Sequence, residues 1–102
     1  MTDAARLTLL KSNLQMITNS NDTLLAFLLQ QGEAALAVEG VTADGSTMYE
    51  ACVIDYAAYL FRKRAASTMA TQGGKSETAM PRFLRWEINN LLLSQKIQEG
   101  QA

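Results

Sequence analysis

Residues 48–65 read MYEACVIDYAAYLFRKRA, and this stretch decides the fold that the sequence predicts. Counted at 100° per residue from Glu50, its apolar side chains gather on one side of a long helix. The opposite side, which we expect to be a contact surface, holds Asp55, Tyr59 and Arg62. The predicted core side holds Val53, Ile54, Ala57, Leu60 and Phe61.

The start of this helix is marked by capping residues. Ser46 or Thr47 can cap its first turn, and Glu50 stands close to the position of a capping box. Residues 40–46, which read GVTADGS, form a turn-rich connector before it.

Two further helices are predicted upstream. Leucines three and four residues apart follow Asp3, an expected N-cap, and indicate a helix that ends near residues 18–20. A leucine-rich helix should then begin at Ser20 or Asn21 and stop at Gly40, because glycine commonly ends helices.

The last helix is predicted to follow a long loop. Residues 67–79, STMATQGGKSETA, have no apolar period, so we expect a flexible loop there. Pro81 suits the first turn of a final helix. The buried stripe of that helix should hold Leu84, Ile88, Leu91 and Leu92, and its outer face Arg82, Arg85, Asn89 and Lys96. The sequence therefore predicts one all-α domain over residues 1–102, a small bundle of three to four helices with a long flexible loop before the C-terminal helix.

Composition limits the function classes. The 102 residues are 48% hydrophobic and 19% charged, as in a globular domain, and the longest apolar runs are too short for a signal peptide or a membrane span. The chain has no histidine, which excludes Ser-His-Asp, Cys-His and His-rich metal sites. An enzyme would have to use Asp55, Lys75 or Cys52 singly, so we predict no catalysis, no metal and no cofactor.

Two candidate motifs are better explained as structure. Gly73, Gly74 and Lys75 resemble the end of a phosphate-binding loop, but Met69 stands where that motif needs another glycine, and no strand precedes it. This favours a polar loop. The single cysteine, Cys52, excludes a disulfide within the chain, and we interpret it as a small buried hydrophobe.

The basic and aromatic residues leave alternatives open. The cations at residues 62–64 can simply stabilise a helix C-terminus, or they can join Arg82 and Arg85 in a patch that faces DNA or an acidic protein. Trp86 can be an interface anchor or a core residue. Asp55 either faces water or pairs with a cation such as Arg62. The net charge of −1 supplies no broad positive field.

Three segments together resemble the head-tail connector proteins of siphophages, the small helical head-completion adaptors that dock beneath the portal. They are residues 19–40 (NSNDTLLAFLLQQGEAALAVEG), residues 48–65, and residues 80–96 (MPRFLRWEINNLLLSQK). In that family an acidic residue precedes a leucine-rich helix, as Asp22 does here, and a helix rich in Ala and Tyr ends in Arg, as at Arg62. The connector at residues 40–46 departs from the pattern because it lacks an aromatic turn.

This resemblance implies a structural function. The chain could be a monomer when free, and would form a ring of identical copies, expected to be a dodecamer when assembled, beneath the portal protein. It would extend the channel through which genomic DNA passes without sequence readout, and offer a docking surface to a stopper or tail-completion protein. The expected locations are the head-tail interface of the virion and, during assembly, the host cytoplasm, with no membrane partner.

The residues expected to contact a partner or a neighbouring copy follow from the predicted surface and the resemblance. They are Tyr59, Arg62, Met69, Gly73, Gly74, Lys75, Arg82, Arg85 and Trp86. The alternative function is a small helical DNA-binding or DNA-packaging accessory protein that uses the arginine and lysine cluster, which predicts strongly salt-dependent binding to duplex DNA.

Overall fold

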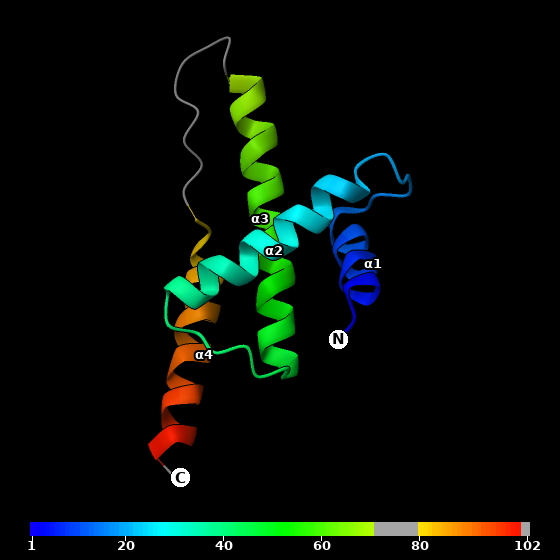
Figure 1. The fold of residues 1–102 in the computed structure, drawn as a ribbon. Helices are drawn as coiled ribbons and strands as arrows, with labels where there is room; N and C mark the ends of the chain where they lie inside the picture. The colour runs from blue at the N-terminus through cyan, green and yellow to red at the C-terminus, as the bar shows by residue number, and fades with distance from the viewer. Residues whose placement is uncertain (71–79, 101–102) are drawn as a thin grey trace.

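The computed structural model describes the backbone of residues 1–70 and 80–100, and the side chains of residues 1–65 and 80–98. Within these ranges the chain forms four α-helices and no strand (Figure 1). The helices are α1 (Asp3–Leu14), α2 (Asp22–Val38), α3 (Thr47–Ala70) and α4 (Arg82–Gly100). The predicted all-α class and the predicted number of helices are confirmed.

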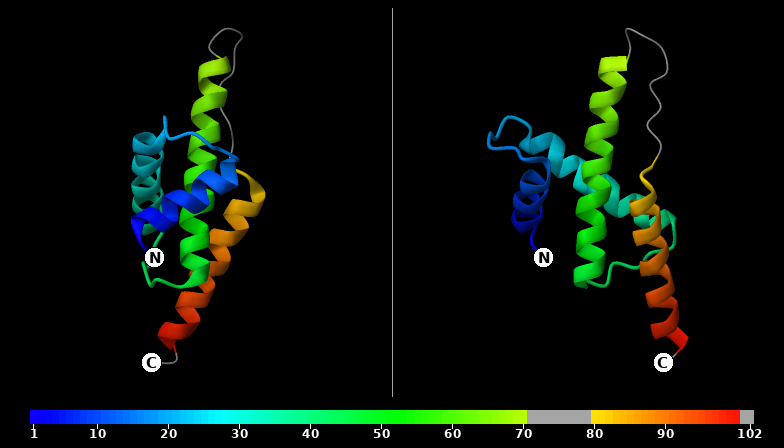
Figure 2. Two further views of the ribbon diagram at one scale, coloured as in Figure 1. Left: turned by 90° about the vertical axis from the view of Figure 1, so that its right-hand side faces the viewer. Right: turned by 180° about the vertical axis from the view of Figure 1, so that it is seen from behind.

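Helix α3 is the centre of the fold. It contacts each of the other three helices, and α1 also contacts α2. Helix α2 crosses one face of α3, while α1 and α4 flank α3 on opposite sides, as the front and rear views agree (Figures 1 and 2). The rear view shows that no described helix covers the remaining face of α3 (Figure 2).

The core lies where these helices meet around α3. Cys52, Val53 and Ala57 are fully buried, which confirms the predicted core side of α3. Burial raises the pKa of the Cys52 thiol to about 12, so the cysteine is the small buried hydrophobe that the sequence indicates. Other fully buried side chains come from all three flanking helices: Leu10, Leu25, Leu36, Leu84 and Ile88.

Tyr59 is placed differently from the prediction. Its side chain is only 9% exposed, and its ring packs edge to face on Tyr56, with 5.8 Å between ring centroids and 81° between planes. Lys63 Nζ lies 5.9 Å from the Tyr59 centroid, at cation–π distance. The expectation that Tyr59 lies on the exposed side is wrong, because a helix with neighbours on three sides buries more than one face.

Helix α1 differs from the prediction at both ends. Thr2, rather than Asp3, is the N-cap, because Thr2 Oγ1 accepts a hydrogen bond from the Ala5 N–H at 3.1 Å. The helix ends at Leu14, well before residues 18–20. Gln15 adopts the left-handed conformation with φ 59°, and the Gln15 and Met16 N–H groups bond back to carbonyls of the last turn. A non-glycine residue in this role carries no clear sequence signal.

The end of α2 agrees with the sequence. Gly40 has φ 100°, and its N–H donates to the Ala37 carbonyl at 3.0 Å. The Val41 N–H donates to the Leu36 carbonyl at 2.9 Å, which completes a Schellman motif. Gly40 is therefore the predicted stop, in the conformation that favours glycine.

Ser46 begins α3 as predicted, because its Oγ accepts the Tyr49 N–H at 3.1 Å. Glu50 does not form a capping box; its carboxylate turns to Arg6 instead. At its other end α3 extends to Ala70, so the first four residues of the predicted loop 67–79 are helical. The rest of that prediction, residues 71–79, lies outside the described residues.

Helix α4 begins directly after Pro81, as the proline predicts. Leu84, Ile88 and Leu91 are at most 2% exposed, which confirms three residues of the predicted buried stripe, whereas Leu92 is only partly buried. Gln95 continues this stripe and binds the connector before α3: its Oε1 accepts the Thr42 N–H at 2.9 Å and its Nε2 donates to the Thr42 carbonyl at 2.7 Å. Two hydrogen bonds to one backbone unit fix the connector against α4.

Candidate assembly surface

The side of α4 that faces away from the core carries large apolar side chains exposed to solvent. Phe83 is 56% exposed, Trp86 66%, Leu93 57% and Ile97 53%. With Asn90 they recur at intervals of three and four residues, which places all five on one face of the helix. We call this row (Phe83, Trp86, Asn90, Leu93 and Ile97) the outer stripe.

Helix α4 therefore has two apolar faces. The first, centred on Ile88, is buried inside the chain, and the outer stripe lies about half a turn away on the opposite side. An exposed row of this kind is unusual for a helix of a monomer, because aromatic rings each carry roughly 150–250 Å² that favours burial. A contiguous exposed apolar patch is typical of a site where another molecule binds.

The predicted contact residues on α4 divide into two groups. Trp86 is exposed, so of its two interpretations the core position is wrong. Arg82 is also exposed, at the first residue of the helix. Arg85 instead bonds within the chain: its Nη2 lies 2.9 Å from Glu39 Oε2 at the end of α2. The hydrogen bond from Arg85 holds the pKa of Glu39 below its usual value.

Arg62 and Asp55 are joined through an asparagine of α1. Arg62 Nη2 donates to Asn13 Oδ1 at 3.2 Å, and Asn13 Nδ2 donates to Asp55 Oδ1 at 3.4 Å. Asp55 is half-buried and so has a polar neighbour, an amide in place of the cation proposed from the sequence. The chain of contacts ties α1 to α3 on the face that α2 leaves open.

The remaining predicted contact residues lie where little or nothing is described. Met69 belongs to α3, although its side chain is not described. Gly73, Gly74 and Lys75 lie outside the described residues.

A groove runs between α1 and α3. Its volume is about 740 Å³, and it is open to solvent along one side. Its apolar lining includes Leu9, which is 44% exposed, Ala51 and Ile54. Asn13 and Asp55 stand at its polar edge. We call it the α1–α3 groove; no sequence pattern indicated it, because its two walls come from segments far apart in the chain.

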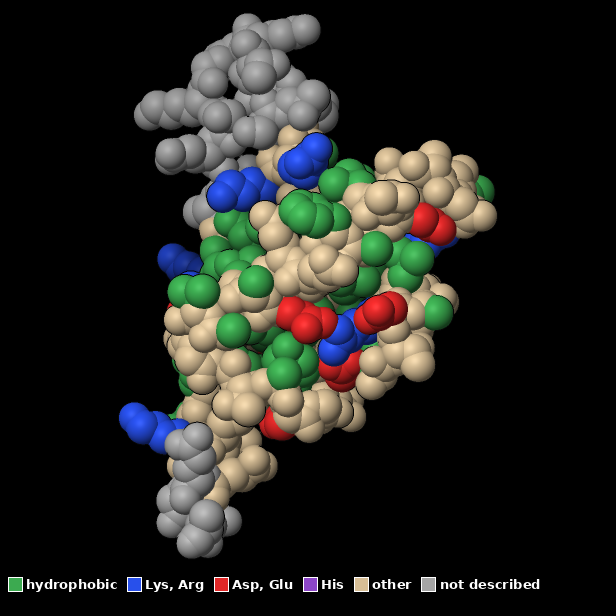
Figure 3. All heavy atoms as spheres, in the orientation of Figure 1, with side chains coloured by type: hydrophobic (Ala, Val, Ile, Leu, Met, Phe, Trp, Pro, Cys, Tyr) green, Lys and Arg blue, Asp and Glu red, His purple; other side chains and the backbone are tan. Residues whose placement is uncertain are grey.

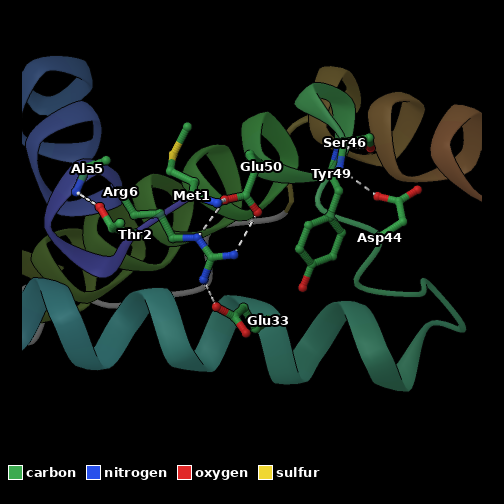
Figure 4. Close-up of polar contacts among 9 residues, drawn as sticks. All are labelled: Met1, Thr2, Ala5, Arg6, Glu33, Asp44, Ser46, Tyr49 and Glu50. Atoms are coloured by element: carbon green, nitrogen blue, oxygen red, sulfur yellow. Dashed lines mark hydrogen bonds and ion pairs between the residues drawn. The ribbon is translucent and has the colours of Figure 1, made fainter.

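A partly buried ionic cluster fixes the walls of this groove (Figure 4). Arg6 of α1 reaches Glu50 of α3 and Glu33 of α2. Glu50 is 4% exposed, and the hydrogen bond from Arg6 lowers its pKa. Arg6 neutralises Glu50. Asp55, the other carboxylate in the groove lining, has no ion pair among the described residues. The cluster was not predicted, since its members lie in three different helices.

The sequence also did not predict that two acidic side chains, Glu87 and Asp55, lie side by side. Glu87 of α4 is half-buried beside Asp55 and Cys52 of α3, and its Oε1 has no hydrogen-bond partner among the described residues. Burial and the neighbouring Asp55 raise the pKa of Glu87 to about 7. The protonated carboxyl tolerates this position better than the carboxylate, which is why the pKa moves into the neutral range.

The described part of the chain has no group of three or more His, Cys, Asp or Glu side chains that could hold a metal ion. Among the described helices, none combines the length and apolarity that crossing a membrane requires. Comparison of the chain with models of protein families, with curated proteins and with solved structures gives no match.

Proposed function

We propose that this chain is a structural assembly protein, a head-to-tail connector subunit that completes the head of a tailed phage or prophage. It forms a ring beneath the portal, extends the DNA channel and presents a docking surface to a stopper or tail-completion protein. It performs no catalysis in this role. Its place is the virion, and the host cytoplasm during assembly.

The observation that carries this proposal is the outer stripe of α4. Helix α4 buries one apolar face in the core of its own chain and leaves Trp86 and Phe83 more than half exposed. Exposed aromatic side chains in such a row are typical of a surface that binds another protein. Tryptophan and its aromatic neighbours supply most of the binding energy in many interfaces. Arg82 beside them adds a cation that can select an acidic partner surface.

The connector class, rather than assembly proteins in general, is supported by the sequence segments that resemble that family. A leucine-rich second helix behind Asp22, a central helix rich in Ala and Tyr that carries arginines at residues 62 and 64, and a final helix behind Pro81 occur here in the same order. The central helix departs from the family pattern in continuing past these arginines to Ala70. The four-helix architecture is compatible with this resemblance.

Light scattering tests the proposal. The purified chain is measured alone and after mixing with the portal ring encoded in the same genome, and we expect a multi-copy ring on the portal. Trp86→Ala should lose portal-dependent assembly at least tenfold, whereas Asn89→Ala, an exposed change on the same helix beside the stripe, should assemble normally. A chain that ignores the portal at every concentration contradicts the proposal.

The second candidate is a DNA-binding or DNA-packaging accessory protein. Arg62, Lys63 and Arg64 are all exposed towards one end of α3, and Lys and Arg side chains gather there in the space-filling view (Figure 3). Arg85 is less available to DNA, because it is paired with Glu39. Binding to duplex DNA that weakens steeply as salt rises, together with no binding to portals, would favour this function.

A further inference from the structure

The outer stripe and the α1–α3 groove lie on different parts of the same molecule, and we infer that they bind each other between copies. The outer stripe of α4 in one copy seats in the α1–α3 groove of the next copy, so that copies join head to tail. This contact between copies adds detail to the proposed function. Only the closure of the copies into a ring rests on that function.

The two surfaces fit in shape and polarity. The outer stripe holds four large apolar side chains with Asn90 between them, and the apolar part of the groove lining includes Leu9, Ala51 and Ile54. A volume of about 740 Å³ lies within the range of roughly 300–1,000 Å³ that encloses a drug-sized molecule, which is room for several side chains. Trp86 and Leu93, about two turns along the helix, can enter it together.

Their charges are complementary as well. The lining of the groove holds one cation, the Met1 amine, which lies 3.8 Å from Glu50 Oε1. Its acids are Glu50, which also pairs with Arg6, and Asp55, which has no ion pair among the described residues. The outer stripe is flanked on one side by Arg82 and Lys96, both exposed. Seating the stripe in the groove therefore brings these cations towards Asp55 of the neighbouring copy.

The charge pattern disfavours the simplest alternative, in which two outer stripes pack on each other. In an antiparallel pair of α4 helices centred on Asn89, Arg82 of one copy would lie beside Lys96 of the other, twice. In a parallel pair, Arg82 would need Glu87 as its partner, but Glu87 is turned towards α3 of its own chain. Like charges placed side by side oppose association, and the groove avoids this.

The position of the two surfaces decides the kind of assembly. Helices α1 and α4 flank α3 on opposite sides, so the stripe cannot reach the groove of its own chain (Figure 2). Each copy thus offers one stripe and one groove, a heterologous contact that continues from copy to copy and makes a ring when the rotation closes.

Two variants that each remove one half of the contact test this inference. Trp86→Glu places a charge in the outer stripe, and Ala51→Arg blocks the groove; both positions are exposed, so the fold should tolerate the changes. The matched controls are Asn89→Glu on α4 and Ala65→Arg on α3, which are exposed positions outside the stripe and the lining. Circular dichroism and thermal unfolding confirm that each variant is folded.

Sedimentation equilibrium and native mass spectrometry then give the number of copies. The wild-type chain and both controls should form multimers, and each test variant alone should lose self-association at least tenfold. An equimolar mixture of the two variants should form a heterodimer and nothing larger, because only one intact stripe and one intact groove remain between them.

Three results would overturn the inference. If Ala51→Arg alone forms stable dimers, the outer stripes pair with each other. If the mixture of variants stays monomeric, the stripe and the groove do not bind each other. If the wild-type chain never self-associates, alone or on a portal ring, there is no contact between copies.

The proposed function is tested separately from this contact. Rings of Ala51→Arg on the portal would refute only the head-to-tail contact. A heterodimer of the two variants, from a chain that does not bind portals, would refute only the connector function.

Discussion

Arg6 and Glu50 form a two-point hydrogen bond between α1 and α3, with Arg6 Nε 2.9 Å from Glu50 Oε1 and Nη2 2.7 Å from Oε2. The two residues are 44 positions apart in the chain. Planar guanidinium and carboxylate groups match in this geometry, and Glu33 of α2 bonds the third nitrogen. One side chain of α1 thereby connects three helices.

Removing either partner should destabilise the fold. Glu50→Ala leaves Arg6 with Glu33 as its remaining partner. We expect the free energy of unfolding to fall by about 3 kcal/mol, because removing one member of a buried ion pair leaves the other charge without full compensation. Urea unfolding measures the change. The double variant Arg6→Met with Glu50→Leu should cost less than the sum of the single changes, and simple additivity would contradict a direct interaction.

The same pair predicts a loss of stability in acid. Arg6 lowers the pKa of Glu50 in the folded chain below the usual 4.5. The contribution of this pair to stability is therefore complete above pH 4.5, and it is lost as the pH falls through the lower pKa of the folded chain. Unfolding measured from pH 6 down to pH 2 should show this loss, and Glu50→Gln should flatten it. An equally steep loss in the variant would assign it to other carboxyls.

Glu87 predicts the opposite slope at higher pH. Its folded pKa of about 7 lies above its usual 4.5, so between these values the folded chain binds more protons than the unfolded chain. Stability should therefore fall as the pH rises from about 4.5 to about 7, by on the order of 2 kcal/mol for this half-buried group.

Glu87→Gln is the matched variant for that slope, because it keeps the shape of the side chain and removes the charge. We expect it to be more stable than the wild type at pH 8 and nearly equal to it at pH 5. Urea unfolding at pH 5, 6, 7 and 8 makes the comparison, and parallel curves for the two proteins would show that Glu87 does not titrate as the structure indicates.

Gln95 should hold the connector to α4. Gln95→Met keeps the volume but removes both hydrogen bonds to Thr42, and we expect a cost of about 1–2 kcal/mol in thermal unfolding. Hydrogen exchange of the Thr42 amide should accelerate in the variant. Gln98→Met, an exposed change on the same helix, is the control, and an unchanged Thr42 amide would mean that the connector is held by other contacts.

Gln15 offers a stabilising change. Its left-handed backbone costs a residue with a side chain roughly 1–2 kcal/mol, which glycine avoids while losing more conformational entropy on folding. Gln15→Gly should raise stability by about 0.5–1 kcal/mol, visible as a higher melting temperature. Gln15→Ala should give no gain, and a gain from alanine would argue against backbone strain as the cause.

The sequence by itself determined the all-α class, both ends of α2 and the starts of α3 and α4. Apolar spacing, the Ser46 cap, the Gly40 stop and the position of Pro81 all act within one or two turns, so they can be read from neighbouring residues. Where the local signal was absent, as at Gln15, the predicted end was wrong.

Only the tertiary structure decided which apolar faces are covered. Tyr59 is buried because α3 has neighbours on three sides, and the outer stripe is exposed because α4 has a neighbour on one side only. The Arg6–Glu50 pair, the Glu87–Asp55 pair and the α1–α3 groove likewise join segments far apart in the chain. The hydrophobic effect rewards burial against any apolar partner, so periodicity shows which side chains favour burial but not which of them the chain itself buries.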